Sequence, residues 1–198
     1  MYGITAIQET YLPVRNVANM RMREIPWITD PSFDFLSESI SSGKIKNILE
    51  FGMGSSTIWF AKQKVNIISV EHNKKYYSLV INSINSINGD MRNMKCILKS
   101  LPYEDAFLEH RSEDFYFDLV LVDGRRRVTC VEASIPFIRQ GGYLMLDNDE
   151  RSRYKEIHNI LSEWDKQVYE QIGVDYTGWQ HKHPEKKWLT TVWQKPSP

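Results

Sequence analysis

The chain has 198 residues, enough for one domain with a full hydrophobic core, and 41% of them are hydrophobic. Its 25 basic residues balance 25 acidic ones, so no net charge favours nucleic acid or an anionic membrane surface. No apolar run approaches the ~20 residues of a membrane span, and the mixed, polar residues 1–19 do not resemble a signal peptide. We therefore expect a cytoplasmic protein with a small-molecule partner and without nucleic-acid or membrane partners. A homodimer stays open.

Composition shows no internal repeat and no linker, which predicts a single domain over residues 1–198. Residues 1–30 are expected to form an N-terminal arm and residues 31–198 the core. Asp30 and Pro31 are typical of a helix start, with Asp30 as the cap, and Gly43 is expected to end that helix. Cys96 and Cys130 lie far apart in apolar surroundings and are expected to be reduced thiols.

From residue 46 onward, strand and helix patterns alternate along the chain. Strands are expected at 46–51, 66–71, 94–98, 117–122 and 143–146, with a terminal antiparallel pair at 167–176 and 188–194. Helices are expected at 55–64, 74–88, 103–111, 128–139 and 152–164. This alternation predicts an α/β fold with a mostly parallel sheet and right-handed crossovers.

Four acids follow apolar runs: Glu50, Glu71, Asp123 and Asp147. Ligands of parallel sheets lie beyond the carboxyl ends of the strands, so these four positions predict a functional edge.

The glycine turn after the first strand has the sequence Gly52-Met53-Gly54-Ser55-Ser56-Thr57. Its glycines would let backbone approach a ligand, and Ser55, Ser56 and Thr57 could cap the next helix or bind that ligand. Thr57 stands where a dinucleotide fingerprint has its third glycine. Glu50 would repel a pyrophosphate and attract an amine. The turn therefore favours an adenosine cofactor that carries an amine over NAD or FAD.

Glu71 ends the second strand, 21 residues after Glu50. That spacing fits an acid that accepts the two ribose hydroxyls of a nucleoside, although Glu71 could also cap the helix that begins at Lys74. The neighbouring His72 could stack near an adenine or face solvent.

Three arginines, Arg125, Arg126 and Arg127, follow Asp123 and Gly124 and open a helix, where the helix dipole disfavours positive charge. Either Asp123 and neighbouring acids offset this charge, or an anionic substrate does.

The fifth strand is followed by Asp147-Asn148-Asp149-Glu150. Asp123, Asp147 and Asn148 offer three oxygen ligands for a divalent cation such as Mg²⁺, and Asp147 could instead act as a general base. One or two of these acids are expected to cap the helix near Ser152. His181 with His183 could form a metal pair but is more typical of an exposed loop. Trp179 could line a substrate pocket.

These motifs together resemble class I S-adenosylmethionine-dependent methyltransferases, over residues 46–194. The stretch 49–57 is similar to their first cofactor motif, Val70-Glu71 to the second, 117–124 to the strand-four motif and 141–147 to the strand-five motif. Asp123 with Asp147-Asn148 is similar to the divalent-cation site of small O-methyltransferases. The arginine-rich loop departs from those enzymes, and their N-terminal substrate helices have no match in residues 1–30.

The resemblance implies a Rossmann-like three-layer sandwich with a seven-stranded sheet, S-adenosylmethionine as cofactor and possible use of Mg²⁺. It implies a methyltransferase acting on the hydroxyl of a small polar or anionic acceptor, such as a sugar or a metabolite. Glu50 and the backbone of residues 52–54 would hold the methionine end, and Glu71 would bind the ribose hydroxyls. Ser55, Ser56, Thr57, His72 and Asp123 would also contact the cofactor. Asp147 would take the hydroxyl proton or, with Asp123 and Asn148, hold a metal that acidifies the hydroxyl. Arg125 and Arg127 would orient the acceptor. A non-catalytic cofactor-binding module and an NAD-type oxidoreductase stay open as alternatives.

Overall fold

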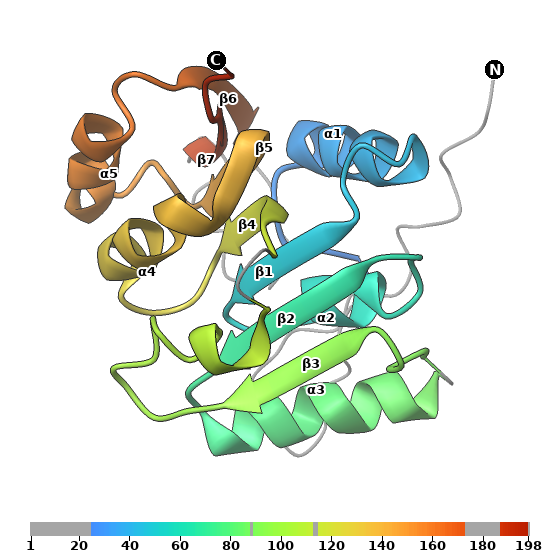
Figure 1. Ribbon diagram of the computed structural model, residues 1–198. Helices are drawn as coiled ribbons and strands as arrows, with labels where there is room; N and C mark the ends of the chain where they lie inside the picture. Colours follow the sequence, from blue (N-terminus) through green and yellow to red (C-terminus); the bar gives the residue numbers. More distant parts are fainter. Residues whose placement is uncertain (1–24, 88, 113–114, 173–186, 198) are drawn as a thin grey trace, which may run out of the picture.

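The computed structural model describes residues 25–87, 89–112, 115–172 and 187–197 (Figure 1). Within them the chain forms one seven-stranded sheet in the order β3-β2-β1-β4-β5-β7-β6. The strands are β1 Asn47–Phe51, β2 Asn66–Glu71, β3 Met94–Leu98, β4 Phe117–Val122, β5 Ile138–Asp147, β6 Asp165–Ile172 and β7 Lys187–Gln194. β1 to β5 pair in parallel, whereas β7 runs antiparallel to both β5 and β6. The predicted mostly parallel sheet with a terminal antiparallel pair is confirmed.

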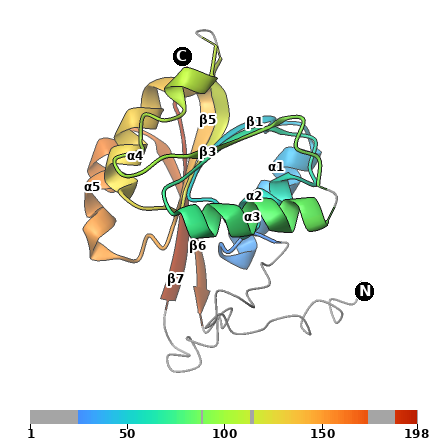
Figure 2. The same cartoon turned by 90° about the horizontal axis from the view of Figure 1, so that it is seen from below.

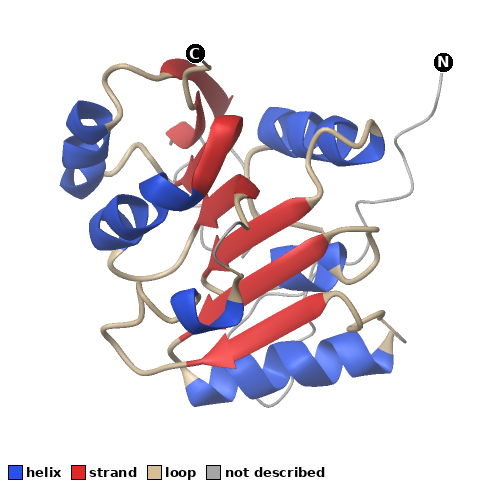
Figure 3. Cartoon of the chain, viewed as in Figure 1, coloured by secondary structure: helices blue, strands red, loops and turns tan. Residues whose placement is uncertain are grey.

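Helices cover both faces of this sheet, which gives three layers (Figures 2 and 3). The α-helices are α1 Asp30–Ser41, α2 Ser55–Phe60, α3 Lys74–Ser86, α4 Arg127–Ser134 and α5 Lys155–Ile160. Three short 3₁₀ turns accompany them: η3 Leu108–His110, η4 Ile135–Phe137 and η5 Ser152–Tyr154. No helix in the described ranges is long and apolar enough to cross a bilayer.

Side-chain alternation along the strands decides which helices meet which face. In β1, Ile48 packs in a cluster with Leu36 of α1 and Phe60 of α2. The neighbouring Leu49 points the other way, into a cluster with Val131 of α4 and Ile157 of α5. α1 and α2 therefore cover one face, and α4 and α5 cover the other.

The predicted helices differ from the structure mainly at their ends. Asp30 is the first residue of α1 and Thr29 precedes it as the cap position, so Asp30 is not the cap. The helix expected over 128–139 is α-helical only to Ser134, because Pro136 lacks the N–H that would continue it. Gly141 and Gly142, which follow the expected helix, lie inside β5.

The helix expected over 103–111 is reduced to the turn η3. Tyr103 and Phe107 are instead buried under the sheet, and tertiary packing overrides the local helical preference there. The helix expected over 152–164 is split into η5 and α5 and ends at Ile160.

The sheet has a topological switch point between β1 and β4. From β1 the chain proceeds outward through β2 to β3, and from β4 it proceeds the opposite way to β5. The loops that leave β1 and β4 therefore separate at their carboxyl ends, where α/β sheets of this kind bind ligands. The arm residues 1–24, the strand end 173–176, Trp179, His181 and His183 lie outside the described residues.

Candidate functional site

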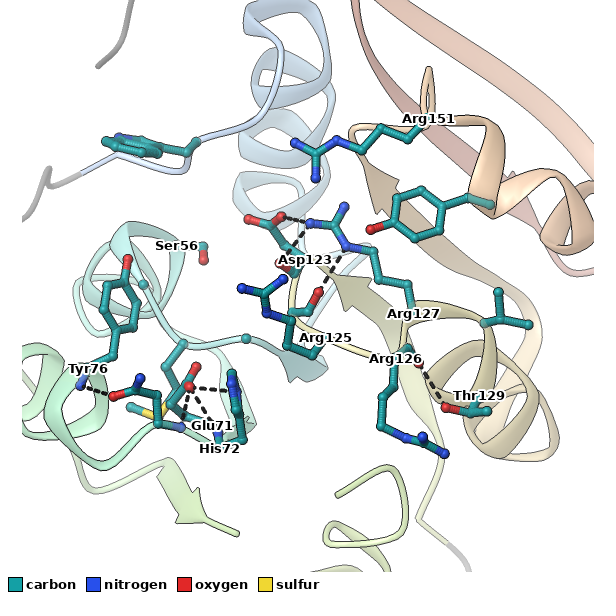
Figure 4. Close-up of a pocket in the computed structure, with 18 of the residues that line it drawn as sticks. Ser56, Glu71, His72, Tyr76, Asp123, Arg125, Arg126, Arg127, Thr129 and Arg151 are labelled. Atoms are coloured by element: carbon teal, nitrogen blue, oxygen red, sulfur yellow. Dashed lines mark hydrogen bonds and ion pairs between the residues drawn. The ribbon is translucent and has the colours of Figure 1, made fainter. Parts of the chain in front are cut away.

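A cavity of about 690 Å³ opens at this switch point. Its walls come from the loops that follow β1, β2 and β4 and from the segment after β5 (Figure 4). This volume is in the range of small-molecule sites. Of the four acids predicted at this edge, Glu71 and Asp123 line the cavity, and Glu50 and Asp147 are not among its lining residues.

The two glycines of the first turn have different roles. Gly52 has a φ of +99°, and a Cβ there would lie 2.6 Å from the backbone of Gly124. It therefore lets the loop after β1 pack directly on the loop after β4. At Gly54 a Cβ would meet only the Tyr76 side chain, whose hydroxyl would be 3.7 Å away on the cavity wall. Gly54 also donates its N–H to Thr57 Oγ1 at 2.8 Å, which fixes the start of α2.

Glu50 lies behind the cavity wall, fully buried. Its carboxylate accepts hydrogen bonds from the hydroxyls of Ser56, Thr57 (2.7 Å) and Ser69 (2.6 Å). Burial raises the pKa of Glu50 to about 7, although the three hydroxyls lower it. Because Ser56 lines the cavity and donates to Glu50, the carboxylate reaches the site through this hydroxyl. Its role toward an amine stays a prediction.

Glu71 is the last residue of β2 and lies on the cavity wall. Its Oε1 accepts the backbone N–H groups of His72 at 2.9 Å and of Asn73 at 2.7 Å. Its Oε2 accepts no hydrogen bond from the described residues. The cap of α3 is Asn73, which accepts the N–H of Tyr76, so Glu71 is not that cap.

His72 also lines the cavity, with Nδ1 2.9 Å from Glu71 Oε1. Its ring packs against Tyr103, with centroids 5.9 Å apart. The imidazole is thus held at the cavity wall, and contact with an adenine stays a prediction.

The arginine-rich loop after β4 is held by protein groups at two of its three arginines. Arg126 forms a bidentate pair with Glu104, at 2.8 and 3.1 Å, and Arg127 pairs with Asp123 at 2.7 Å. Arg125 makes no side-chain hydrogen bond or ion pair within the described chain, and in Figure 4 it extends into the cavity. Acidic side chains thus offset the charges of Arg126 and Arg127, and the side chain of Arg125 is available to a ligand.

Asp147 faces away from the cavity, toward β7. Its Oδ1 accepts hydrogen bonds from Trp188 Nε1 at 2.9 Å and Thr190 Oγ1 at 2.8 Å. Burial, and then the charge of Asp123, raises the pKa of Asp147 well above its ordinary value. The expectation that Asp147 meets an acceptor directly therefore does not fit this geometry.

The three residues predicted to hold a divalent cation come near one another without forming a shared site. Asp123 Oδ1 and Asn148 Oδ1 both accept hydrogen bonds from Arg127 Nη2, at 2.7 and 3.3 Å, and the Asp147 carboxylate is taken by β7. Across the described ranges, no three His, Cys, Asp or Glu side chains gather as a metal site.

Asp149 and Glu150 were candidates to cap the following helix, but they do not cap it. Asp149 accepts from Thr191 Oγ1 at 2.5 Å and lies 2.9 Å from His158 Nε2, and Glu150 accepts the N–H of Leu189 at 3.1 Å. Both acids therefore tie the segment after β5 to β7. Cys96 and Cys130 are free thiols, as expected.

Several site residues had no assigned role in the sequence analysis. Tyr103 is the least predictable: its hydroxyl donates to the Arg125 carbonyl at 3.0 Å and accepts the Arg125 N–H at 2.9 Å, from 22 residues away. The cavity is also lined by Trp27, Tyr76, Arg151, Arg153 and Tyr154. For Tyr76, Arg151, Arg153 and Tyr154, a position in the segment that follows a strand could have indicated a place at the site. Trp27 and Tyr103 offered no such signal.

No family model matches the sequence, and no curated protein resembles it significantly. Solved structures do match, and they define the architecture as the class I S-adenosylmethionine-dependent methyltransferase fold.

One match is cofactor-bound Rv0187 from MTB, with 16% identity, a TM-score of 0.65, and coverage of 88% of this chain and 85% of that one. A second is an O-methyltransferase from Bacillus cereus in complex with SAH (17% identity, TM-score 0.62, coverage 85% and 84%). A third is the O-methyltransferase TomG from Streptomyces achromogenes in complex with SAM, with 14% identity, a TM-score of 0.64, and coverage of 85% of this chain and 81% of that one. At identities this low the likeness establishes the fold.

Proposed function

We propose that this protein is a methyltransferase that uses S-adenosylmethionine. The observation that carries the proposal is the position of Glu71: it ends β2 on the wall of a cavity that begins at the Gly52–Gly54 turn. An acid at this place suits the two hydroxyls of a ribose. Solved proteins with the same fold contain SAM or SAH.

The cavity residues divide between the two ends of such a cofactor. Gly54 adds no side chain to the wall, and Ser56 connects that wall to the Glu50 carboxylate, which suits the amine of the methionine end. Glu71 offers Oε2 to the ribose, while its Oε1 is fixed by two backbone N–H groups. When bound, the cofactor supplies a methyl group on a cationic sulfur, so the chain mainly has to align an acceptor.

The acceptor we propose is a small hydroxyl compound with a negative charge, such as an acidic sugar or another anionic metabolite. Arg125 and Arg151 line the cavity beside Asp123, and both can bind carboxylate or phosphate oxygens. Asp123 is the acid placed to take the hydroxyl proton. Burial raises the pKa of its carboxyl, which favours proton acceptance, whereas Arg127 lowers it.

The fold leaves the acceptor atom open. An N-methyltransferase, NodS from Bradyrhizobium japonicum, and an rRNA methylase from Streptococcus thermophilus also match this chain, with TM-scores of 0.55 and 0.60. We favour a hydroxyl acceptor because a carboxylate, Asp123, lines the cavity, and a hydroxyl nucleophile is activated by loss of its proton.

Calorimetric titration with S-adenosylhomocysteine tests the cofactor assignment. We expect binding to the wild-type protein and a loss of about tenfold to a hundredfold in affinity for Glu71→Gln, since a hydrogen bond to a charged group contributes about 1.5–3 kcal/mol. Glutamine keeps an oxygen for the two backbone N–H groups, so the end of β2 should stay folded. Glu132→Gln, on the exposed side of α4, is the matched control. Equal affinity in wild type and Glu71→Gln would remove the ribose assignment.

A transfer assay tests the acceptor class. With isotope-labelled S-adenosylmethionine, we expect methylation of hydroxyl compounds that carry a carboxylate or phosphate and little methylation of their neutral analogues. Arg125→Ala should raise KM for the anionic acceptor about tenfold or more while leaving S-adenosylhomocysteine affinity unchanged. Equal turnover of charged and neutral members of a pair would contradict the anionic acceptor.

A further inference from the structure

The guanidinium of Arg127 lies at the centre of the loops that follow β4 and β5. Its side chain is only 5% exposed. Nε donates to the Gly124 carbonyl at 3.0 Å, Nη1 donates to the Asp147 carbonyl, and Nη2 donates to the Asp123 carbonyl at 2.9 Å. Nη2 also reaches the side-chain oxygens of Asp123 at 2.7 Å and Asn148 at 3.3 Å. All three nitrogens are therefore engaged by protein oxygens.

Tyr154 adds a second restraint on the same group. The Arg127 guanidinium carbon lies over its ring, 5.1 Å from the ring centroid, and Figure 4 shows Arg127 beside Asp123. Stacking on an aromatic ring and a planar set of donors are properties of arginine that lysine does not share. The site is thus built for a guanidinium.

The oxygens around Arg127 include those that a divalent cation would need. Asp123 and Asn148 both point their side-chain oxygens at Nη2, and Asp147 directs only its carbonyl inward. A divalent cation requires several oxygen ligands at 2.0–2.6 Å and would be repelled by an adjacent guanidinium. The residues present do not fit such an ion while Arg127 is in place.

We propose that the Arg127 guanidinium takes the place of the divalent cation between Asp123 and Asn148, so that the site holds its geometry without a metal. Arg127 is then a positioning residue: it fixes the Asp123 carboxylate at the cavity and joins the loop after β4 to the loop after β5. The consequence for catalysis, that methyl transfer needs no divalent metal, rests on the function proposed above. The cation-binding behaviour does not depend on that function.

Titration with Mn²⁺, followed by the electron paramagnetic resonance signal of the free ion, tests this directly. We expect no Mn²⁺ site in the wild-type protein up to about 1 mM. In Arg127→Ala the oxygens of Asp123 and Asn148 lose their cation, and we expect Mn²⁺ affinity to increase at least tenfold over wild type. Arg127→Ala combined with Asp123→Asn should lose that gain. Arg126→Ala, at another cavity arginine whose guanidinium pairs with Glu104 outside this cluster, should behave as wild type.

Two results would overturn the proposal. One is a wild-type Mn²⁺ site at micromolar affinity that Asp123→Asn abolishes. The other is a folded Arg127→Ala protein whose Mn²⁺ affinity equals that of wild type, since the guanidinium would then not be what excludes the cation. If Arg127→Ala does not fold, the wild-type titration with its Asp123→Asn control decides alone.

The affinity of the wild-type protein for S-adenosylhomocysteine should be the same in the presence of EDTA as in the presence of Mg²⁺. Loss of that binding in both conditions would count against the methyltransferase and leave the Mn²⁺ result standing.

Discussion

The buried carboxylate of Glu50 contributes a pH dependence to the stability of this protein. Its pKa is about 7 in the folded protein, against 4.5 for an ordinary glutamate, because burial disfavours the charged form. Between these two values the folded state binds more protons than the unfolded state. The free energy of unfolding therefore falls as the pH rises from about 4.5 to 7, and the loss is complete above pH 7.

Glu50→Gln should remove this pH dependence. The free energy of unfolding of the variant, relative to wild type, should rise by about 3 kcal/mol between pH 4.5 and pH 8, since one pKa unit corresponds to about 1.36 kcal/mol. Urea unfolding of both proteins at several pH values measures this difference in free energy. Carboxylates that the two proteins share contribute equally to both and cancel when one value is subtracted from the other. A difference between the two proteins that stays constant with pH would show that Glu50 has the same pKa in the folded and unfolded states.

Residue types at the strand ends could be predicted from the sequence, but the directions of their side chains could not. Glu71 and Asp123 line the cavity, whereas Asp147 is bonded to Trp188 and Thr190 of β7. Those partners lie 41 and 43 residues further along the chain, so no local pattern could reveal that Asp147 would turn away. The same limit applies to Tyr103, which is placed by packing rather than by a motif.

Two loops at the carboxyl edge of the sheet are built as one unit. Gly52 packs on Gly124 without room for a side chain, and a Cβ at Gly124 would lie 2.2 Å from the Tyr103 hydroxyl. Tyr103 in turn bonds both backbone groups of Arg125. The loop after β1 is thereby fixed against the loop after β4, and the cavity wall is held in shape before any ligand binds.

Gly52→Ala should therefore destabilise the protein by several kcal/mol, about 2–4, because it combines a positive φ with a clash against backbone that cannot move away. Gly54→Ala is the matched control: a Cβ there meets Tyr76 at an ordinary contact distance, so stability should change by less than about 1 kcal/mol. Chemical denaturation measures both. Similar losses in the two variants would show that the first turn is constrained as a whole and not at Gly52.

At the level of elements, strands were predicted better than helices. β2, β3 and β4 begin and end where the apolar runs indicated. β4 is a mostly apolar run that the sheet buries along its whole length, so there the pattern and the structure have one cause. Helix ends depend on single events, such as Pro136 after α4 or the side-chain contacts of Tyr103, and these shortened the helices expected over 128–139 and 103–111.

Across the whole molecule, a formal net charge of zero conceals a local concentration of arginines at the carboxyl edge of the sheet. Five arginines line the cavity at the carboxyl edge: Arg125, Arg126, Arg127, Arg151 and Arg153. At the opposite edge, Asp118 accepts the N–H groups of Lys46 and Asn47, both at 2.8 Å, and closes the amino end of β4 onto β1. The carboxyl end of the sheet is thus arranged for a ligand, and at the amino end the protein's own groups join β4 to β1.

Cofactor binding should consequently protect one end of the molecule only. With S-adenosylhomocysteine at about 100 times its Kd, we expect about 2.7 kcal/mol of added stability and slower amide hydrogen exchange in residues 52–57, 71–76 and 123–128. Residues 44–47 and 117–118, at the amino edge, should gain protection only through global stabilisation. Mass-spectrometric hydrogen exchange under native conditions distinguishes local protection at the carboxyl edge from global stabilisation. Equal extra protection at both edges, or none at residues 71–76, would contradict a ligand seated at the switch point between β1 and β4.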